Sequence, residues 1–347
     1  MFKKRSSQVT TVGLELDPGH VAAAEVGVNG SITLKRGAVA QLRPGVLRDG
    51  EVVDATELAQ TLKTMFEEND LPRHVRIGIA HQRIVVRTLD LPRFDDEKAL
   101  AAAVKVEAPD HIPMPIGEAI VDWHSLGEID TPSGPRTRVV VVAVRREMVD
   151  RLVSVAGEAG LSIAGVDLSA FAMIRALGAG SGSGQTQLYI NVAGLTNVAV
   201  ANASGCLFTR AASGGLSEMA HTLSDRRGLT LEHAHQWMRH VGLATPLEEL
   251  EGDADLVGGV RVVLDEGVHQ LADTVRNSLN FYQMQESAER VESGVVTGPA
   301  VAIPGFTERL SEHLRLPLES AVVKSDGDLP NAGSLTVAAG LAVESVA

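Results

Sequence analysis

The segment Val12-Gly-Leu-Glu-Leu-Asp-Pro-Gly-His-Val21 joins an apolar strand to a tight turn. The same order, strand and then turn, recurs far along the chain in Leu188-Tyr-Ile-Asn-Val-Ala-Gly-Leu-Thr-Asn197. A third segment, Val295-Val-Thr-Gly-Pro-Ala-Val-Ala-Ile-Pro-Gly305, runs from a strand into a Gly/Pro turn that precedes a helix. The spacing of these three segments decides the fold that the sequence predicts.

Each of the first two segments begins a predicted three-stranded β-meander. Alternating apolar residues and short turns predict strands at 12–16, 22–28 and 31–38, and a helix with an apolar stripe at 56–69. The second half repeats the plan, with strands at 187–192, 197–202 and 206–212. Two similar meanders about 175 residues apart predict a duplicated α/β fold in which two domains enclose a cleft. The glycine-rich tract 178–184 is expected to be a mobile hinge between the domains.

An insertion separates the meanders, at about residues 74–146. It is expected to hold strands at 75–80, 84–89, 121–126 and 139–144, and a helix at 95–108 that stops before Pro109. These elements predict a small α+β module attached to the first domain. The predicted domains are the first, 1–73 with 147–180 and 331–347; the module, 74–146; and the second, 181–330. In the second domain helices are expected at 216–226, 231–241 and 266–285.

Composition limits the classes of function. The chain has 347 residues, enough for two cores, and a net charge of -13 that argues against nucleic-acid binding. No apolar run approaches the roughly 18 residues that a transmembrane helix needs, and the basic residues 1–5 are expected to form a disordered end. Cys206, the single cysteine, fits a reducing compartment and a half-buried strand thiol rather than a nucleophile. The sequence therefore favours a cytoplasmic α/β protein.

Short motifs in and beyond the insertion narrow this prediction to one family. They are Val85-Val-Arg-Thr-Leu-Asp-Leu-Pro-Arg93, Val104-Lys-Val-Glu-Ala-Pro-Asp-His-Ile-Pro-Met-Pro115, Val121-Asp-Trp-His-Ser-Leu-Gly-Glu128 and Asn277-Ser-Leu-Asn-Phe-Tyr282. In content and order they resemble the PilM family of type IV pilus assembly, over essentially the whole chain. The resemblance implies an actin-like ATPase fold with two duplicated domains around a nucleotide cleft. It also implies that the insertion is an FtsA-like α+β subdomain.

The resemblance assigns a nucleotide site whose first loop is altered in this chain. Intact relatives carry an Asp, a glycine, hydroxyl residues and a lysine there, which bind metal and phosphate. The matching positions here are Glu15, Asp17, Pro18-Gly19-His20 and Ala22. Asp17 places a negative charge where phosphate would sit, and Pro18 removes a backbone donor.

The other parts of that site are altered as well. Asn191 replaces the carboxylate that holds magnesium through water, and the adenosine loop reads Gly298-Pro299-Ala300. His235 and Met238 stand where relatives carry a Glu-x-x-Lys pair, whereas Gly214-Gly215 is kept. These changes predict a degenerate site with no catalytic residue, which holds no nucleotide or binds ATP or ADP with magnesium weakly. Its assigned positions are Glu15, Asp17, Gly19, His20, Asn191, Gly194, Thr196, Gly214, Gly215, Gly298 and Pro299.

The resemblance also implies a protein partner. PilM-like proteins capture the amino-terminal cytoplasmic peptide of a membrane-anchored protein, PilN, in a groove between the first domain and the inserted module. An extended peptide needs apolar pockets and exposed strand edges. The implied location is cytoplasmic, at the inner membrane through partners, with a pilus assembly ATPase or platform protein as further candidate partners. The groove positions implied here are Arg87, Val104, Ile112, Pro113 and Met114.

Other functions were weighed against this one. An active actin-like ATPase coupled to pilus or secretion machinery is the alternative. A membrane-tethered filament protein is disfavoured, because residues 335–347 lack basic residues and look like a helix that packs onto the first domain. A metal site is disfavoured, because His233 and His235 face apart on one helix and His240 lies two turns from His233. The run that begins at Asp253 lacks the closing Glu of a calcium loop and is expected to be an exposed loop.

Overall fold

The first domain is built on a six-stranded sheet. The structure, a computed structural model, describes residues 10–94, 96–132, 134–178, 185–285, 288–327 and 331–344. Within these ranges the strand order is β10-β6-β1-β2-β3-β16, and a two-stranded hairpin of β4 (Leu47–Arg48) and β5 (Glu51–Val52) stands apart. The strands of the sheet are β1 (Val12–Asp17), β2 (His20–Val28), β3 (Ile32–Gln41), β6 (His74–Ile79), β10 (Ser162–Leu168) and β16 (Lys324–Ser325).

Helices cover both faces of this sheet. Side chains alternate along its strands, and here apolar side chains point to both faces. In β2, Val21 packs into a core with α1 and α3, whereas its neighbour Ala22 packs into a core against α9. The aspartate Asp54 starts α1, since its Oδ1 accepts a hydrogen bond from the backbone N–H of Glu57 at 3.0 Å. The four helices are α1 (Ala55–Glu68), α3 (Arg146–Glu158), α4 (Ser169–Leu177) and α9 (Ala332–Leu341).

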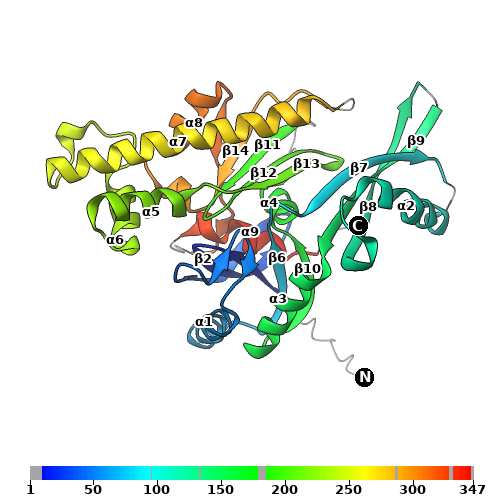
Figure 1. Ribbon diagram of the computed structural model, residues 1–347, viewed down its shortest axis with the longest axis horizontal. Coiled ribbons are helices and arrows are strands. Elements are labelled where there is room, and N and C mark those ends of the chain that lie inside the picture. Colours follow the sequence, from blue (N-terminus) through cyan, green and yellow to red (C-terminus); the bar gives the residue numbers. More distant parts are fainter. Residues whose placement is uncertain are drawn as a thin grey trace.

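The second domain repeats the meander in a five-stranded sheet of order β13-β12-β11-β14-β15. Its core lies between this sheet and the helices α5 to α8, and α7 runs along the outside of the domain (Figure 1). The strands are β11 (Gln187–Val192), β12 (Thr196–Asn202), β13 (Gly205–Ala212), β14 (Gly294–Thr297) and β15 (Leu318–Ser320). The helices are α5 (Leu216–Arg227), α6 (Leu231–Val241), η2 (Leu247–Glu249), α7 (Ala254–Gln283), η3 (Pro299–Ala302) and α8 (Phe306–Leu314).

Two helices of the first domain connect the two sheets. Residues of α4 and α9 share one buried cluster with Tyr189, Ala199 and Cys206 of the second sheet. Helix α9 also packs on β1, β2 and β3 and on η3. The carboxy-terminal segment therefore packs back onto the first domain, as its sequence predicts, and it also ties that domain to the second.

The inserted module has one strand fewer than the sequence predicts. Its sheet has order β7-β9-β8, with α2 packed against it, and it projects to one side of the molecule (Figure 1). Strand β6, expected to open the module, instead pairs in parallel with β1 and β10 in the first sheet. That long-range pairing has no local sequence signal. The elements are β7 (Val85–Pro92), α2 (Glu97–His111), η1 (Ile116–Glu118), β8 (Ala119–Thr131) and β9 (Gly134–Arg145).

Two helix boundaries also differ from expectation. Helix α2 continues through Pro109 to His111, and the backbone N–H of Ile112 donates to the carbonyl of Pro109 in a tightened last turn. Asp253 does not lie in an open loop: it caps α7, its Oδ1 accepting from the N–H of Leu256 at 2.9 Å. Helix α7 therefore starts at Ala254. The expected hinge at 178–184, apart from its first residue, and the expected disordered end at 1–5 lie outside the described residues.

Candidate functional site

Two hairpin turns from different domains meet at the carboxylate of Asp17, the last residue of β1. Its Oδ1 accepts hydrogen bonds from the backbone N–H of Gly19 at 3.0 Å and of Gly194 at 2.8 Å. Its Oδ2 accepts from the N–H of Leu195 at 3.0 Å. Asp17 is buried. The β1–β2 turn and the β11–β12 turn, predicted as the first two loops of a nucleotide site, are thus joined directly.

A second hydrogen bond joins the two domains two residues earlier on β1. The side-chain amide of Asn191 donates to Oε1 of Glu15 at 3.1 Å. Both side chains are buried. Burial and the nearby Asp17 carboxylate raise the pKa of Glu15 to about 8, against the opposing effects of His20 and of the Asn191 hydrogen bond. In the folded protein the raised pKa of Glu15 favours the protonated form of its side chain.

Histidines border the same cluster. Nδ1 of His20 lies 3.4 Å from Oδ1 of Asp17, and no partner of its Nε2 is found among the described residues. Burial alone lowers the pKa of His20, but the hydrogen bond and charge of Asp17, with Glu15, outweigh it and raise that pKa above its ordinary value. Burial, then the charges of Arg239, His20 and His221, lower the pKa of His235 on α6 to about 4.

The glycines assigned to the site allow close backbone approaches. A Cβ on Gly215 would overlap the carbonyl oxygen of Ala193, and one on Gly298 would overlap the Asn191 side chain. Gly214 and Gly298 both have positive φ, at 87° and 92°. The hydroxyl of Thr196 donates to the carbonyl of Gly214 at 2.6 Å, and Pro299 begins the short helix η3. These residues therefore lie where backbone segments approach one another closely.

Two other positions that the resemblance assigns to nucleotide contacts lie in apolar cores. Ala22, which matches the lysine, is fully buried against α9. Met238 is fully buried in the core of the second domain. At the positions that the resemblance assigns to phosphate, Asp17 accepts hydrogen bonds from the amides of both turns, and among the described residues no lysine or arginine contacts its carboxylate.

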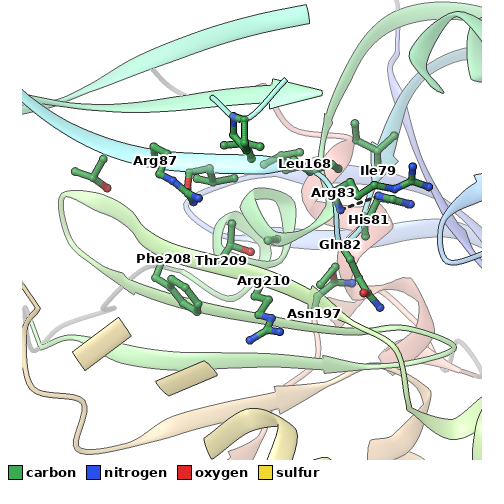
Figure 2. A pocket seen from close by; sticks show the side chains of 18 of the residues that line it. Ile79, His81, Gln82, Arg83, Arg87, Leu168, Asn197, Phe208, Thr209 and Arg210 are labelled. Atoms are coloured by element: carbon green, nitrogen blue, oxygen red, sulfur yellow. Dashed lines mark hydrogen bonds between the residues drawn. The ribbon is translucent and has the colours of Figure 1, made fainter. Parts of the chain in front are cut away.

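A separate cavity of about 1050 Å³ lies between the module and the second domain. One wall comes from β7 with the segment before it and the other from β13; Figure 2 shows Arg87 on the first and Thr209 and Arg210 on the second. Of the predicted groove residues, Arg87, Pro113 and Met114 line this cavity. Val104 and Ile112 do not, because both are buried in the core of the module.

Arginines that the sequence prediction missed also line the cavity. Arg145 and Arg210 are exposed, and within the described ranges neither they nor Arg87 has an ion-pair partner. Arg83 differs, because it pairs with Glu51 at 2.9 Å. Among the described residues, these unpaired arginines concentrate positive charge at the cavity, in a chain whose net charge is -13.

Both walls of the cavity are free strand edges. In the described part of the chain β7 pairs only with β9, and β13 pairs only with β12. Their outer N–H and C=O groups are therefore available to an added strand. Leu207 and Phe281 add apolar surface beside these edges, and half of the Phe281 side chain is exposed. The arrangement can hold an extended chain by its backbone.

The remaining candidates carry no site. Cys206 is buried, its pKa is raised to about 12 by burial, and its Sγ contacts the carbonyl of Phe208, which suits a structural thiol. His240 contacts the carbonyl of Glu251 at 2.9 Å. Over the described residues no cluster of side chains could hold a metal ion, and no helix has the length and apolarity to cross a membrane.

Comparison with solved structures defines the class of protein. A PilM–PilN type IV pilus biogenesis complex matches with a TM-score of 0.76 and 24% identity, covering 96% of this chain and 98% of that chain. The ethanolamine utilization protein EutJ from Carboxydothermus hydrogenoformans matches with a TM-score of 0.57 and 15% identity, covering 95% and 88%. MreB5 of Spiroplasma citri bound to ADP matches with 0.55 and 12%, covering 96% and 95%. The chain therefore has the actin-like ATPase fold.

The family follows from the sequence itself. Residues 20–345 match the family described as type IV pilus assembly protein PilM. Because this match spans nearly the whole chain, the protein belongs to the PilM family of type IV pilus assembly proteins. The resemblance drawn from the motifs at 85–93 and 104–115 is confirmed.

Proposed function

We propose that this protein is a cytoplasmic adaptor of type IV pilus assembly that binds the amino-terminal peptide of a PilN-like inner-membrane protein. Membership of the PilM family and the likeness to a PilM–PilN complex support the choice of partner. One observation carries the proposal: the cavity between the free edges of β7 and β13. A peptide bound there would hold the protein at the inner membrane through its partner.

The chemistry of the cavity fits an extended peptide. Strand edges on opposite walls supply hydrogen bonds that do not depend on sequence, and side-chain pockets supply selectivity. Met114 and Leu207 offer apolar contacts. Arg87, Arg145 and Arg210 can donate to peptide carbonyls and carboxylates. Pro113 stands at a tight turn beside β7, in which the backbone N–H of Met114 donates to the carbonyl of Ile112 at 2.8 Å.

The experiment is a titration of a synthetic peptide, the cytoplasmic amino terminus of the PilN-like protein from the same organism, by calorimetry. We expect Arg87→Ala and Arg210→Ala each to weaken binding by about 1 kcal/mol or more, because each removes a charged donor from one wall. Arg48→Ala is the matched control, since Arg48 is an exposed strand arginine outside the cavity. Equal affinity in all four proteins would place the peptide elsewhere.

The second part of the proposal is that the nucleotide site is degenerate. Its support is the pair of cross-cleft contacts, Asp17 to the Gly194 and Leu195 amides and Glu15 to Asn191. A calorimetric titration with ATP and magnesium is expected to give weak binding or none. Tight magnesium-dependent binding with steady ATP hydrolysis would favour the alternative, an active actin-like ATPase.

A further inference from the structure

The Asp17 carboxylate occupies a site of a kind that binds free anions. Three backbone N–H groups, from Gly19, Gly194 and Leu195, converge on its two oxygens within 3.0 Å. Successive backbone amides at a turn form a concavity that selects anions such as phosphate. Here the anion is a side chain of the protein, and the donors come from both domains.

Local turn geometry explains only one of these three bonds. The bond to Gly19, two residues along the chain, is the contact that an Asp commonly makes at the start of a turn. The bonds to Gly194 and Leu195 span 177 and 178 residues and join the six-stranded sheet to the five-stranded sheet. They need the two hairpin turns to be held face to face, so they belong to the closure of the cleft.

The space around the carboxylate is fitted to it. A Cβ added to Gly194 would overlap Oδ1 of Asp17, and it would lie 2.8 Å from the backbone nitrogen of Gly19. A Cβ added to Gly19 would lie 2.7 Å from Oγ of Ser217, the second residue of α5. Only glycine at both turns lets the backbones close around the side chain. The enclosure leaves no room for a second anion while Asp17 is present.

We propose that Asp17 is an internal replacement for a phosphate group, which holds the two domains closed with no ligand. This inference rests on the degenerate nucleotide site of the proposed function and goes beyond it, because it gives Asp17 the place of the ligand's phosphate; it is independent of the peptide cavity. Its consequence is a permanently closed adaptor whose peptide cavity is not switched by nucleotide. A second consequence is a hidden anion site: without the Asp17 side chain, the three amides would take a free oxyanion such as inorganic phosphate.

The test compares wild type with Asp17→Gly and Asp17→Asn by thermal unfolding, in phosphate and in chloride at equal ionic strength. We expect both variants to unfold at least about 2 °C below wild type. Phosphate should raise the midpoint of Asp17→Gly with the logarithm of its concentration, as a ligand that binds only the folded state does. In wild type and in Asp17→Asn, where a side chain still fills the site, phosphate should give only the smaller, non-specific rise that a kosmotropic anion gives to folded proteins. Asp225→Asn, an exposed carboxylate on α5, is the matched charge control.

A second measurement keeps the inference testable if Asp17→Gly fails to fold. In Asp17→Asn, hydrogen exchange at the amides of Gly194 and Leu195 should be faster than in wild type. Unchanged exchange and an unchanged midpoint in Asp17→Asn would overturn the proposal. So would an Asp17→Gly protein that folds with the wild-type midpoint and no response to phosphate. A wild-type protein that does not bind the peptide would instead count against the peptide-binding part of the proposed function.

Discussion

At the scale of residues, the cleft holds a buried acid–base cluster in which the titrations of Glu15 and His20 act in one direction and that of His235 in the other. Glu15 and His20 have raised pKa values, so each favours the folded state at low pH, and this contribution falls as pH rises through the raised value. His235 has a lowered pKa, so its contribution is present above its ordinary value of 6.5 and is lost as pH falls toward about 4. The window of Glu15 runs from its ordinary pKa of 4.5 to about 8.

Replacing Glu15 should expose that window. Between pH 4.5 and about 8 the folded state holds a proton that the unfolded state has released, so the free energy of unfolding falls as pH rises. In Glu15→Gln this dependence is absent. Relative to wild type, the variant should therefore gain roughly 1 kcal/mol or more between pH 5.5 and pH 8 in urea unfolding. Glu68→Gln, at an exposed position on α1, should show no such change. A constant difference between variant and wild type at both pH values would contradict the assignment to Glu15.

The residue scale also shows what sequence alone could predict about the site. The negative charge of Asp17 at a phosphate position can be read from the sequence. Its hydrogen bonds to Gly194 and Leu195 cannot be read from the sequence. They span 177 and 178 residues, so they depend on how the fold places the two turns. Likewise, the spacing of Val104 and Ile112 gives no sign that both face the interior of the module and not its groove.

At the scale of elements, the sequence pattern predicted the helices and strands whose formation depends on neighbouring residues. Helix α6 has the expected bounds, and the meander strands agree within a few residues. Strand β6 was assigned to the wrong sheet, because its partners β1 and β10 are distant in sequence. The start of α7 was missed, because Gly258 and Gly259 weaken the helical pattern that burial of Val257 and Val260 restores.

The crossing of α4 and α9 gives a prediction at the same scale. Gly340 on α9 touches the backbone of Ala172 on α4 so closely that a Cβ would overlap its carbonyl oxygen. Gly340→Ala should therefore destabilise the protein by about 1–3 kcal/mol, although alanine favours helix. Gly258→Ala on α7 is the control: no atom lies near its added Cβ, so it should be neutral or stabilise by up to about 1 kcal/mol. Urea unfolding of both variants measures the two free energies, and a stabilising Gly340→Ala would disprove the close crossing.

At the scale of the whole molecule, the two halves and the module divide the tasks. Helices α4 and α9 and the contacts of Asp17 and Glu15 join the two sheets. The module and the second domain then present β7 and β13 across one cavity (Figure 2). A rigid pair of domains would keep these edges at a fixed separation, which lowers the cost of ordering on binding. We infer that the proposed adaptor uses its actin-like fold as a fixed frame.

Hydrogen exchange of the wild-type protein, with the PilN-like peptide and separately with ATP and magnesium, tests this account most directly. The account predicts that the peptide slows exchange in β7 and β13, whose free edges it covers. It predicts that ATP with magnesium leaves the turns at 17–20 and 193–196 unchanged, because Asp17 already occupies their amides. Unaltered exchange in both edge strands with saturating peptide, or new protection of those turns by ATP, would contradict it.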